Sequence, residues 1–422
     1  MTEILFLSHR IPYPPNKGDK IRSWHWLKGL AERFRVHLGT FVDDPEDWQY
    51  VPLLREVCGE VCVRPLSPHV ARFRSLSGIV SGRALTISYY QDKALKAWLR
   101  RLAAERPLAS VFAYSSSMAP YAELVAGWRD LPRVVDICDV DSDKWRQYST
   151  KHGWPLNWIY SREARLLERW EARCAGSFDA TVVVTEAEAR LMRRIAPDSA
   201  HRIRVLSNGV DTNYFDPALP HVDPFSRASP TIVFTGALDY RPNVDAVDWF
   251  AREILPAVRE KVSAANFCIV GSNPTAAVRS LARLEGVTVT GRVPDVRPYL
   301  AHAALVVAPL RIARGVQNKV LEALAMARPI VATPNAIQGI EDVTASELTV
   351  AEGGAAFAAA VAGKLRAAVP TVPAAREFVA RRYGWRSQVE TLADWLDGDL
   401  HEHTAARPEP PVVASTLLGE QR

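Results

Sequence analysis

Cysteine is scarce in this sequence, and its five residues are mostly isolated. They fit neither a disulfide framework nor the spacing of a zinc site, which favours a reducing compartment. Long apolar runs are also missing, because no stretch approaches the roughly 20 apolar residues that span a membrane. The opening residues, MTEILFLSHR, hold too short an apolar run for a secretory signal. These absences predict a cytoplasmic protein whose membrane contact is at most peripheral, on the inner face.

The chain has 422 residues, and its net charge of +5 is unevenly spread. A chain of this length buries more than one core, so we expect two domains. Residues 64–106 hold nine Lys or Arg against two acids, together with apolar side chains such as Trp98 and Leu99. Mixed basic and apolar surfaces are typical of contact with anionic lipid, although a solvated face is the alternative. No nucleic-acid-binding motif accompanies the charge, so we expect no nucleic-acid partner.

Strand-like and helix-like segments alternate along the whole chain, which predicts an α/β fold with parallel sheets. We expect two Rossmann-like domains, an N-terminal one over residues 1–208 and a C-terminal one over residues 209–380. The short apolar segments that predict strands are residues 4–7, 36–41, 110–114, 133–137, 181–185, 231–236, 266–271, 287–291, 304–309 and 329–333.

The sequence SNGVD at residues 207–211 interrupts the alternation and predicts a hinge. Two domains joined by a short hinge suggest a cleft with one substrate held by each half, because ligands bind outside the carboxyl ends of parallel strands. Residues 381–398 include an amphipathic helix pattern that would pack back across the hinge. Residues 399–422 lose all periodicity and predict a disordered tail.

Residues with phosphate-binding chemistry follow the strands of the second domain. Gly315 precedes a helix that has Lys319 and Glu322 near its start. The amino end of a helix presents unpaired N–H groups and a positive dipole, which favour phosphate. Lys319 adds a positive charge, and Glu322 could accept hydrogen bonds from the two hydroxyls of a ribose. A solvated Lys–Glu pair on a helix surface is the alternative.

Two further loops of the second domain complete a nucleotide site. The loop TGALDYRPN, residues 235–243, contains Gly236 and places Arg241 near a second phosphate. In VTVTGRVPDVRPYL, backbone groups near Arg292 and Val293 could read the edge of a base. A base, a ribose and a diphosphate then each have a partner, which predicts a nucleoside-diphosphate ligand.

Four aspartates gather in DICDVDSDKW, residues 136–145, at the end of a predicted strand of the first domain. Two carboxylates one residue apart in a loop can both reach one hard divalent cation. From the residues alone, a metal clamp, a proton-handling site and a polar turn all remain open.

Taken in order, several segments resemble the family 4 glycosyltransferases of the GT-B fold over about residues 3–397. The resemblance is carried by NGVD, FTGALDYRPN, VTVTGRVPD, GVQNKVLEALAMARPIVAT and YGWRSQVETL. Within that family, LSHRIPYPPNKGDKIRSW and VVDICDVDSDKW are similar to the sugar transferases associated with bacterial PEP-CTERM/exosortase systems, which make exopolysaccharide. The resemblance implies retaining, hexosyltransferase-type transfer from a nucleotide sugar, with no metal or other cofactor. The implied acceptor is a polysaccharide or a lipid-linked glycan, for example on polyprenyl diphosphate.

The resemblance also assigns roles to residues. It places the donor diphosphate against Arg241 and Lys319, which would stabilise the charge on the leaving group. It puts the ribose on Glu322. Gly18 in the first domain would allow the backbone to approach the diphosphate or the acceptor closely. The loop amides that complete this donor site are those of Gly315, Val316, Gln317 and Asn318.

Two positions depart from the family pattern. Arg314 stands where relatives have the first of two glutamates, so it could contact a phosphate or carboxylate instead. Cys138 stands where many relatives have a His, and a thiol cannot act as a cation near pH 7. Asp139 is therefore the first choice for the polar group at the reaction centre, followed by Asp136 and Asp141. Arg241 and Lys319 would stabilise the diphosphate in place of a metal ion. The aspartate cluster of residues 136–145 is therefore interpreted as the acceptor-facing wall of the cleft.

Two other functions share this pattern. A nucleotide-sugar epimerase has the same fold, but it needs acid/base groups beside the donor sugar. A non-catalytic protein that binds nucleotide sugars or polysaccharide would tolerate the missing glutamate and histidine.

Overall fold

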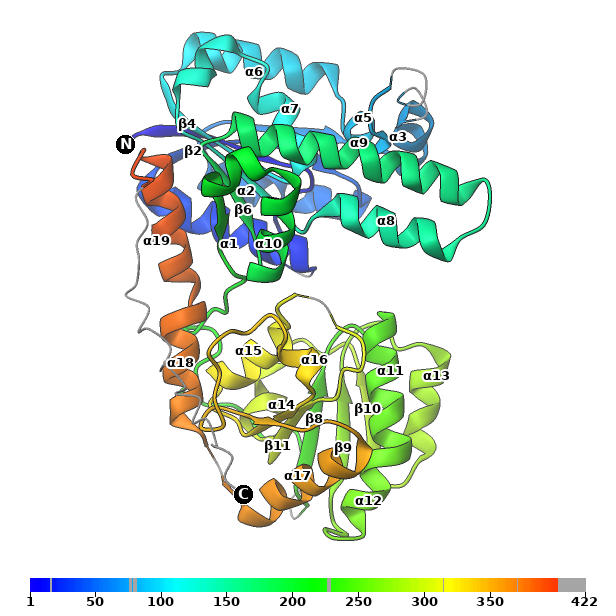
Figure 1. Ribbon diagram of the computed structural model, residues 1–422. Coiled ribbons are helices and arrows are strands. Elements are labelled where there is room, and N and C mark those ends of the chain that lie inside the picture. Colours follow the sequence, from blue (N-terminus) through cyan, green and yellow to red (C-terminus); the bar gives the residue numbers. More distant parts are fainter. Residues whose placement is uncertain are drawn as a thin grey trace, which may run out of the picture.

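The computed structural model describes residues 1–15, 17–75, 78, 82–225, 229–313, 315–369 and 371–400. It has two domains, one above the other in Figure 1, and each is a parallel sheet with helices packed on it. The predicted fold class, two Rossmann-like domains with parallel sheets, is confirmed. Position 314 and residues 401–422, the larger part of the predicted tail, lie outside the described residues.

The N-terminal domain is built on a seven-stranded sheet in the order β3-β2-β1-β4-β5-β6-β7, with every neighbouring pair parallel. Side chains of a strand alternate between the two faces, so β1 supplies two cores. Ile4 and Phe6 pack with Trp26 in one core, whereas Leu5 and Leu7 pack in the other. The strands are β1 (Glu3–Ser8), β2 (Arg35–Val42), β3 (Val61–Pro65), β4 (Leu108–Tyr114), β5 (Arg133–Cys138), β6 (Ala180–Val183) and β7 (Ile203–Val205).

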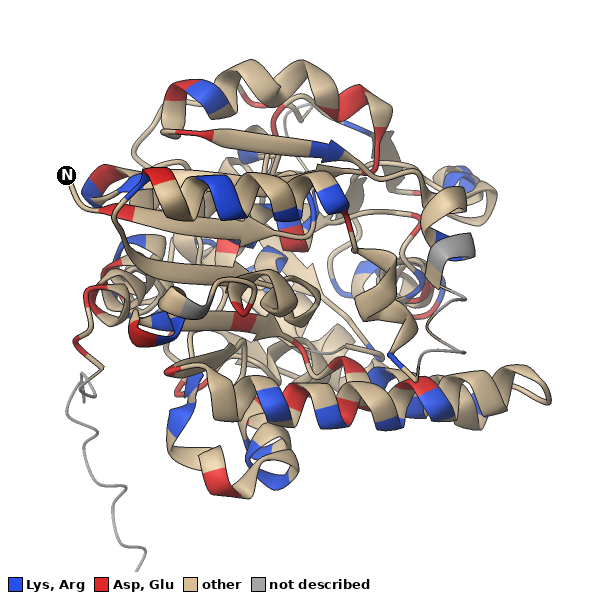
Figure 2. Cartoon of the chain, turned by 90° about the horizontal axis from the view of Figure 1, so that it is seen from above, with Lys and Arg blue, Asp and Glu red and all other residues tan. Residues whose placement is uncertain are grey.

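Helices cover both faces of this sheet, and the hairpin of α8 and α9 extends well beyond it (Figure 1). Seen from above, charges of both signs are interspersed along the helices (Figure 2). The helices are α1 (Gly18–Arg33), α2 (Val51–Val57), α3 (Pro68–Ser75), α5 (Leu85–Tyr89), α6 (Lys93–Glu105), α7 (Ala119–Ala122), α8 (Asp141–Lys151), α9 (Leu156–Ser177) and α10 (Glu186–Ile195). Short 3₁₀ turns are η1 (Pro45–Tyr50), η2 (Ser116–Met118), η3 (Ala126–Asp130) and η4 (Pro197–Arg202).

The C-terminal domain has a six-stranded parallel sheet in the order β10-β9-β8-β11-β12-β13 around one continuous core. Its strands are β8 (Thr231–Thr235), β9 (Asn266–Val270), β10 (Val287–Gly291), β11 (Leu305–Ala308), β12 (Ile330–Ala332) and β13 (Thr349–Val350). Its helices are α11 (Arg241–Trp249), α12 (Leu255–Arg259), α13 (Ala276–Ser280), α14 (Arg297–Ala301), α15 (Asn318–Ala325), α16 (Pro334–Ile337) and α17 (Gly354–Ala367), with a π turn η5 (Phe250–Ile254) and a 3₁₀ turn η6 (Leu281–Arg283).

Two segments cross between the domains side by side. After α18 (Pro373–Tyr383), the chain turns at Gly384 and enters α19 (Trp385–Leu396), which packs on α1 of the N-terminal domain. The other crossing passes Val210, whose N–H donates to the carbonyl of Tyr383 at 2.7 Å. Gly29 on α1 permits the close packing of α19, because a Cβ there would lie 2.5 Å from a methyl group of Val389. The hinge therefore consists of two chain segments, one at Val210 and one at Gly384.

Candidate active site at the facing ends of the two sheets

Lys319 is held at the amino end of α15, on the side of the C-terminal domain that faces the N-terminal domain (Figure 1). Its Nζ donates to Oδ1 of Asn243 at 2.5 Å and lies 4.3 Å from the centre of the Phe234 ring. Burial lowers the pKa of Lys319 to about 7, although the charge of Glu322 opposes the shift. Burial likewise raises the pKa of Glu322 to about 7. An anionic ligand beside Lys319 would raise its pKa again and keep it cationic.

Gly236, at the end of β8, lies directly beside the Lys319 ammonium group. A Cβ at Gly236 would be 3.0 Å from Nζ of Lys319 and 2.8 Å from Nδ2 of Asn243, and its φ of 155° also suits glycine. Behind it, a Cβ at Gly271 would be 1.7 Å from the carbonyl oxygen of Gly236. The two glycines allow these strand ends and the Lys319 ammonium group to approach one another closely.

The loop before α15 is seated on a third glycine. A Cβ at Gly339 would lie 2.6 Å from the carbonyl carbon of Gly315 and 2.7 Å from the N atom of Val316. Gly315 itself has φ of 64°, in the left-handed region. Asn318 begins the helix, and its buried Oδ1 has no hydrogen-bond partner within the described chain. A buried acceptor of this kind is satisfied when a ligand donor reaches it.

Four other residues predicted on the donor side are Gln317, Arg241, Arg292 and Val293. The Gln317 side chain bends back to the carbonyl of Gly315 at 3.4 Å, and Gln317 is the residue that precedes α15. Arg241, the first residue of α11, is exposed and has no ion pair among the described residues. Arg292 is exposed as well, whereas the side chain of Val293 packs against the domain core. The side chain of Val293 is thus partly buried, and its backbone is the predicted contact with a base.

Asp136 lies inside the N-terminal domain and is fully buried. Its Oδ2 accepts from Nε of Arg22 at 2.7 Å and from Nε1 of Trp26 at 2.9 Å, and its Oδ1 accepts from the N–H of Cys138 at 3.0 Å. A carboxylate with three donors inside a core contacts a substrate only if these bonds break. The geometry therefore favours a structural role for Asp136 over the predicted place at the reaction centre.

Arg22 connects that buried carboxylate to the hinge. Its guanidinium group donates to the carbonyl of Leu206 at 2.8 Å, to the carbonyl of Ser207 at 3.1 Å and to Oδ1 of Asn208 at 3.1 Å. One side chain thus joins α1, β5 and the segment before Val210 that crosses between the domains.

The other two predicted aspartates lie nearer the surface. Asp139 is exposed, and Asp141 is the first residue of α8. Burial raises the pKa of Asp141, and the charge of Asp139 adds to that rise, while Lys144 and His9 oppose it. These interactions place Asp139, Asp141 and His9 near one another. Burial keeps Cys138 a neutral thiol by raising its pKa.

His9 follows β1 and belongs to the same group. Its ring stacks on Tyr114 with centroids 5.6 Å apart, and its Nε2 lies 3.6 Å from Oδ2 of Asp19. The buried Nδ1 has no hydrogen-bond partner in the part of the chain that the structure describes. Burial alone would raise the pKa of Asp19, but the hydrogen bond from His9 and the charge of Arg10 lower it overall. The sequence gives His9 no signal beyond its position after a strand.

Gly18, the predicted site of close approach, is the first residue of α1. A Cβ there would have no neighbour within 4 Å. Packing within the chain therefore does not require glycine at this position, and the space beside it is free for a ligand. No cluster of three or more His, Cys, Asp or Glu among the described residues could hold a metal ion.

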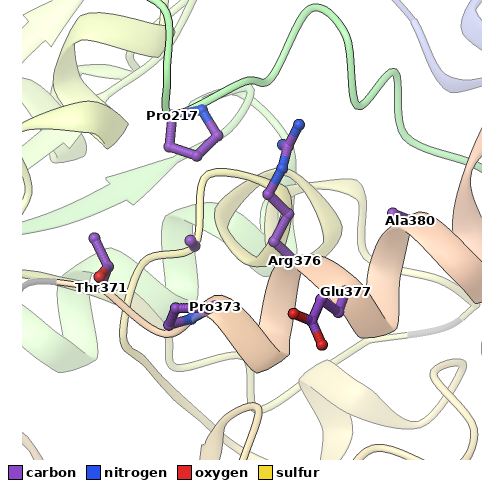
Figure 3. Close-up of a pocket in the computed structure, with 7 residues that line it drawn as sticks. Pro217, Thr371, Pro373, Arg376, Glu377 and Ala380 are labelled. Atoms are coloured by element: carbon purple, nitrogen blue, oxygen red, sulfur yellow. The ribbon is translucent and has the colours of Figure 1, made fainter.

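A cavity of about 360 Å³ lies away from these residues, where α18 begins (Figure 3). Arg376 in its lining donates to the carbonyls of Phe215 and Ala325, each at 2.8 Å. None of the predicted site residues lines this cavity. Its lining is Pro217, Ala327, Thr371, Pro373, Arg376, Glu377 and Ala380.

Two protein families match the sequence, one in each domain. Residues 20–209 match the glycosyl transferase 4-like domain, and residues 229–366 match the glycosyl transferases group 1. The second match contains Gly236, Lys319 and Glu322. A search of curated proteins finds no match.

Solved glycosyltransferases share the fold over nearly the whole chain. A glycosyltransferase from Rickettsia africae ESF-5 has a TM-score of 0.63 at 12% identity, over 95% of this chain and 99% of that one. The Anabaena protein HepE, solved with UDP, has 0.62 at 15% identity, over 94% and 100%. WaaG, a glycosyltransferase involved in lipopolysaccharide biosynthesis, has 0.63 at 17% identity, over 94% and 100%. The chain therefore belongs to the family 4 glycosyltransferases of the GT-B fold, which transfer a sugar from a nucleotide sugar.

Proposed function

We propose that this enzyme is a retaining hexosyltransferase that moves a sugar from a nucleoside-diphosphate sugar to a lipid-linked or polysaccharide acceptor in exopolysaccharide synthesis. The observation that carries the donor site is the Lys319 ammonium group, held on Asn243 beside the backbone of Gly236. Such a preorganised cation stabilises charge that develops on a leaving diphosphate. The exopolysaccharide pathway rests on the resemblance of residues 7–24 and 134–145, which contain His9, Asp19 and Asp136.

In the proposed complex, the diphosphate contacts Lys319 and Arg241 together with the amides at the start of α15. Glu322 accepts from the ribose hydroxyls, and backbone groups near Arg292 and Val293 meet the base. During transfer, the bond between the anomeric carbon and the diphosphate oxygen breaks. The acceptor oxygen bonds to that carbon on the same face, and its proton leaves.

The acceptor side is formed by the N-terminal domain. We place Asp139 and Asp141 there, with His9 held between Tyr114 and Asp19. Their carboxylates and the imidazole can orient an acceptor hydroxyl and receive its proton.

The basic residues 64–106 are the proposed contact with the inner face of a membrane. Part of this charge is neutralised, because Arg64 pairs with Asp92, and Arg101 and Arg106 both pair with Glu60. The remaining cations include Lys93 and Arg100, which are exposed on α6. No helix in the described ranges has both the length and the apolar character to cross a bilayer.

The test begins with thermal shifts in UDP, GDP and ADP and then in their sugars, because a ligand at 100 times its Kd stabilises by about 2.7 kcal/mol. UDP is the first choice, since HepE is solved in complex with UDP-glucose. The stabilising sugar nucleotide is then incubated with polyprenyl-diphosphate glycans, with and without a chelator.

Transfer with retained anomeric configuration supports the proposal, and loss of transfer in chelator contradicts metal independence. Donor binding without transfer to any acceptor favours a non-catalytic binder, and an epimer formed without acceptor favours an epimerase.

A further inference from the structure

The tip of the α8–α9 hairpin carries large apolar side chains in solvent. Residues 151–158, KHGWPLNW, are all exposed, and the hairpin extends beyond the rest of the domain (Figures 1 and 2). Trp154 is 84% exposed, Trp158 51% and Leu156 43%. Scattered exposed apolar residues are normal, but two tryptophans and a leucine within five positions form a patch. Such a patch marks a contact surface.

The charge around this tip has one sign. From Lys144 to Arg162 the sequence contains four Lys or Arg and no Asp or Glu. Arg146 pairs with Asp143 and Glu168, and the Arg162 guanidinium donates to backbone carbonyls. Lys144 and Lys151 are exposed and form no ion pair with other described residues. Positive charge therefore flanks the patch, and Lys151 lies at its edge without an ion pair in the described part of the chain.

We propose that this tip docks on the surface of an anionic lipid bilayer, with Trp154, Leu156 and Trp158 at the level of the headgroups. Tryptophan prefers the interface between lipid and water, and lysine is attracted to anionic headgroups. The tip includes a loop, whose backbone polar groups need water, so insertion stops in the interfacial region.

Docking here fixes the distance between the membrane and the proposed acceptor site. α8 has eleven residues and begins at Asp141, so its far end stands about 16 Å from that residue. A lipid-linked diphosphate sugar could extend over this distance from the bilayer surface. This consequence rests on the proposed lipid-linked acceptor, whereas docking itself does not.

Part of the basic stretch 64–106 contacts the same hairpin. Arg162 of α9 donates to the carbonyls of Gly78 at 2.8 Å and Arg83 at 3.3 Å. The two surfaces could therefore meet one membrane, and variants of each are needed to tell them apart.

The experiment is co-sedimentation of the full chain with vesicles of phosphatidylcholine, alone or mixed with phosphatidylglycerol, in the absence of donor and acceptor. We expect binding to the anionic vesicles that weakens as salt is added. In Trp154→Ser/Leu156→Ser/Trp158→Ser the affinity should fall at least about tenfold, because the interfacial apolar area is lost. Lys151→Gln should reduce it about fivefold. Val222→Ser removes an apolar side chain that is 86% exposed after the hinge, away from both basic surfaces, and should bind as the wild type does.

Unchanged thermal unfolding confirms that the triple variant is folded, since all three side chains are exposed. Wild-type affinity in the triple variant overturns the proposal. Loss of binding in Arg72→Gln/Arg100→Gln, with the triple variant unaffected, also overturns it and assigns the contact to residues 64–106. If the wild type binds no vesicle and instead forms a dimer that the triple variant cannot form, the tip is a contact between copies of the chain.

Discussion

Arg22 and Asp136 are 114 residues apart in the sequence and form a fully buried ion pair, with Nε 2.7 Å from Oδ2. The same guanidinium group donates hydrogen bonds to the carbonyls of Leu206 and Ser207, in the segment before Val210 that crosses between the domains. Removing one partner leaves an uncompensated buried charge, which is far more costly than losing a surface pair. This pair therefore links the stability of the N-terminal domain to the position of the hinge.

Asp136→Asn should destabilise the N-terminal domain by about 3–5 kcal/mol, because the Arg22 charge stays buried without its partner. Denaturant unfolding measures the loss. Asp248→Asn, which breaks the exposed pair with Arg252, should change stability by no more than about 1 kcal/mol. Wild-type stability with abolished transfer would instead place Asp136 at the reaction centre.

Lys319→Met should lower the rate of sugar transfer by about 10²–10³-fold, since a preorganised group that stabilises the leaving charge is removed. Steady-state kinetics with the donor identified by thermal shift measures the effect. Lys261→Gln removes an exposed lysine of the same domain and should leave the rate unchanged. Full activity in Lys319→Met would move the donor diphosphate away from α15.

Gly236→Ala should weaken nucleotide binding, because the added methyl group would press on the Lys319 ammonium and the Asn243 amide. Isothermal titration with the nucleotide measures the affinity. The matched control is Gly363→Ala in α17, where a Cβ meets nothing within 4 Å and the helix gains up to about 1 kcal/mol. Undiminished affinity in Gly236→Ala would show that nucleotide binding does not depend on the close approach of Gly236 to Lys319.

Nucleotide binding should take up a proton above pH 7. Burial lowers the pKa of free Lys319 to about 7, so the amine is largely neutral at pH 8. A bound diphosphate favours the charged form, raises that pKa and draws a proton from the buffer. Titration calorimetry at pH 8 in buffers of different ionisation enthalpy detects the uptake. Equal apparent heats in all buffers would contradict it, and Lys319→Met supplies the baseline.

The proposed donor side could be located from the sequence because its residues follow the strand pattern. Gly236 follows β8 and Lys319 is the second residue of α15, and parallel strands bring such loops to one edge of a sheet. The role of Asp136 was not predictable, because its partner lies on a helix far away in the sequence. β5 is almost entirely buried, so its residues show no alternation that could assign Asp136 to a face.

His9 shows a second limit. A histidine after a strand has no distinguishing neighbours in the sequence, and its position on Tyr114 depends on β4, about a hundred residues later.

The tip of the α8–α9 hairpin shows the reverse case. Its tryptophans are visible in the sequence, but an amphipathic core helix would contain the same residue types, so only the fold reveals their exposure.

The return of α19 to the first domain sets an order for folding during synthesis. Trp385 packs on Trp26 with ring centroids 5.2 Å apart, and Leu392 and Leu396 belong to the same core. A ribosome therefore releases the N-terminal domain with an uncovered apolar face and must make the whole C-terminal domain before the covering helix emerges. A chain terminated before residue 385 would keep that face exposed and be prone to aggregation.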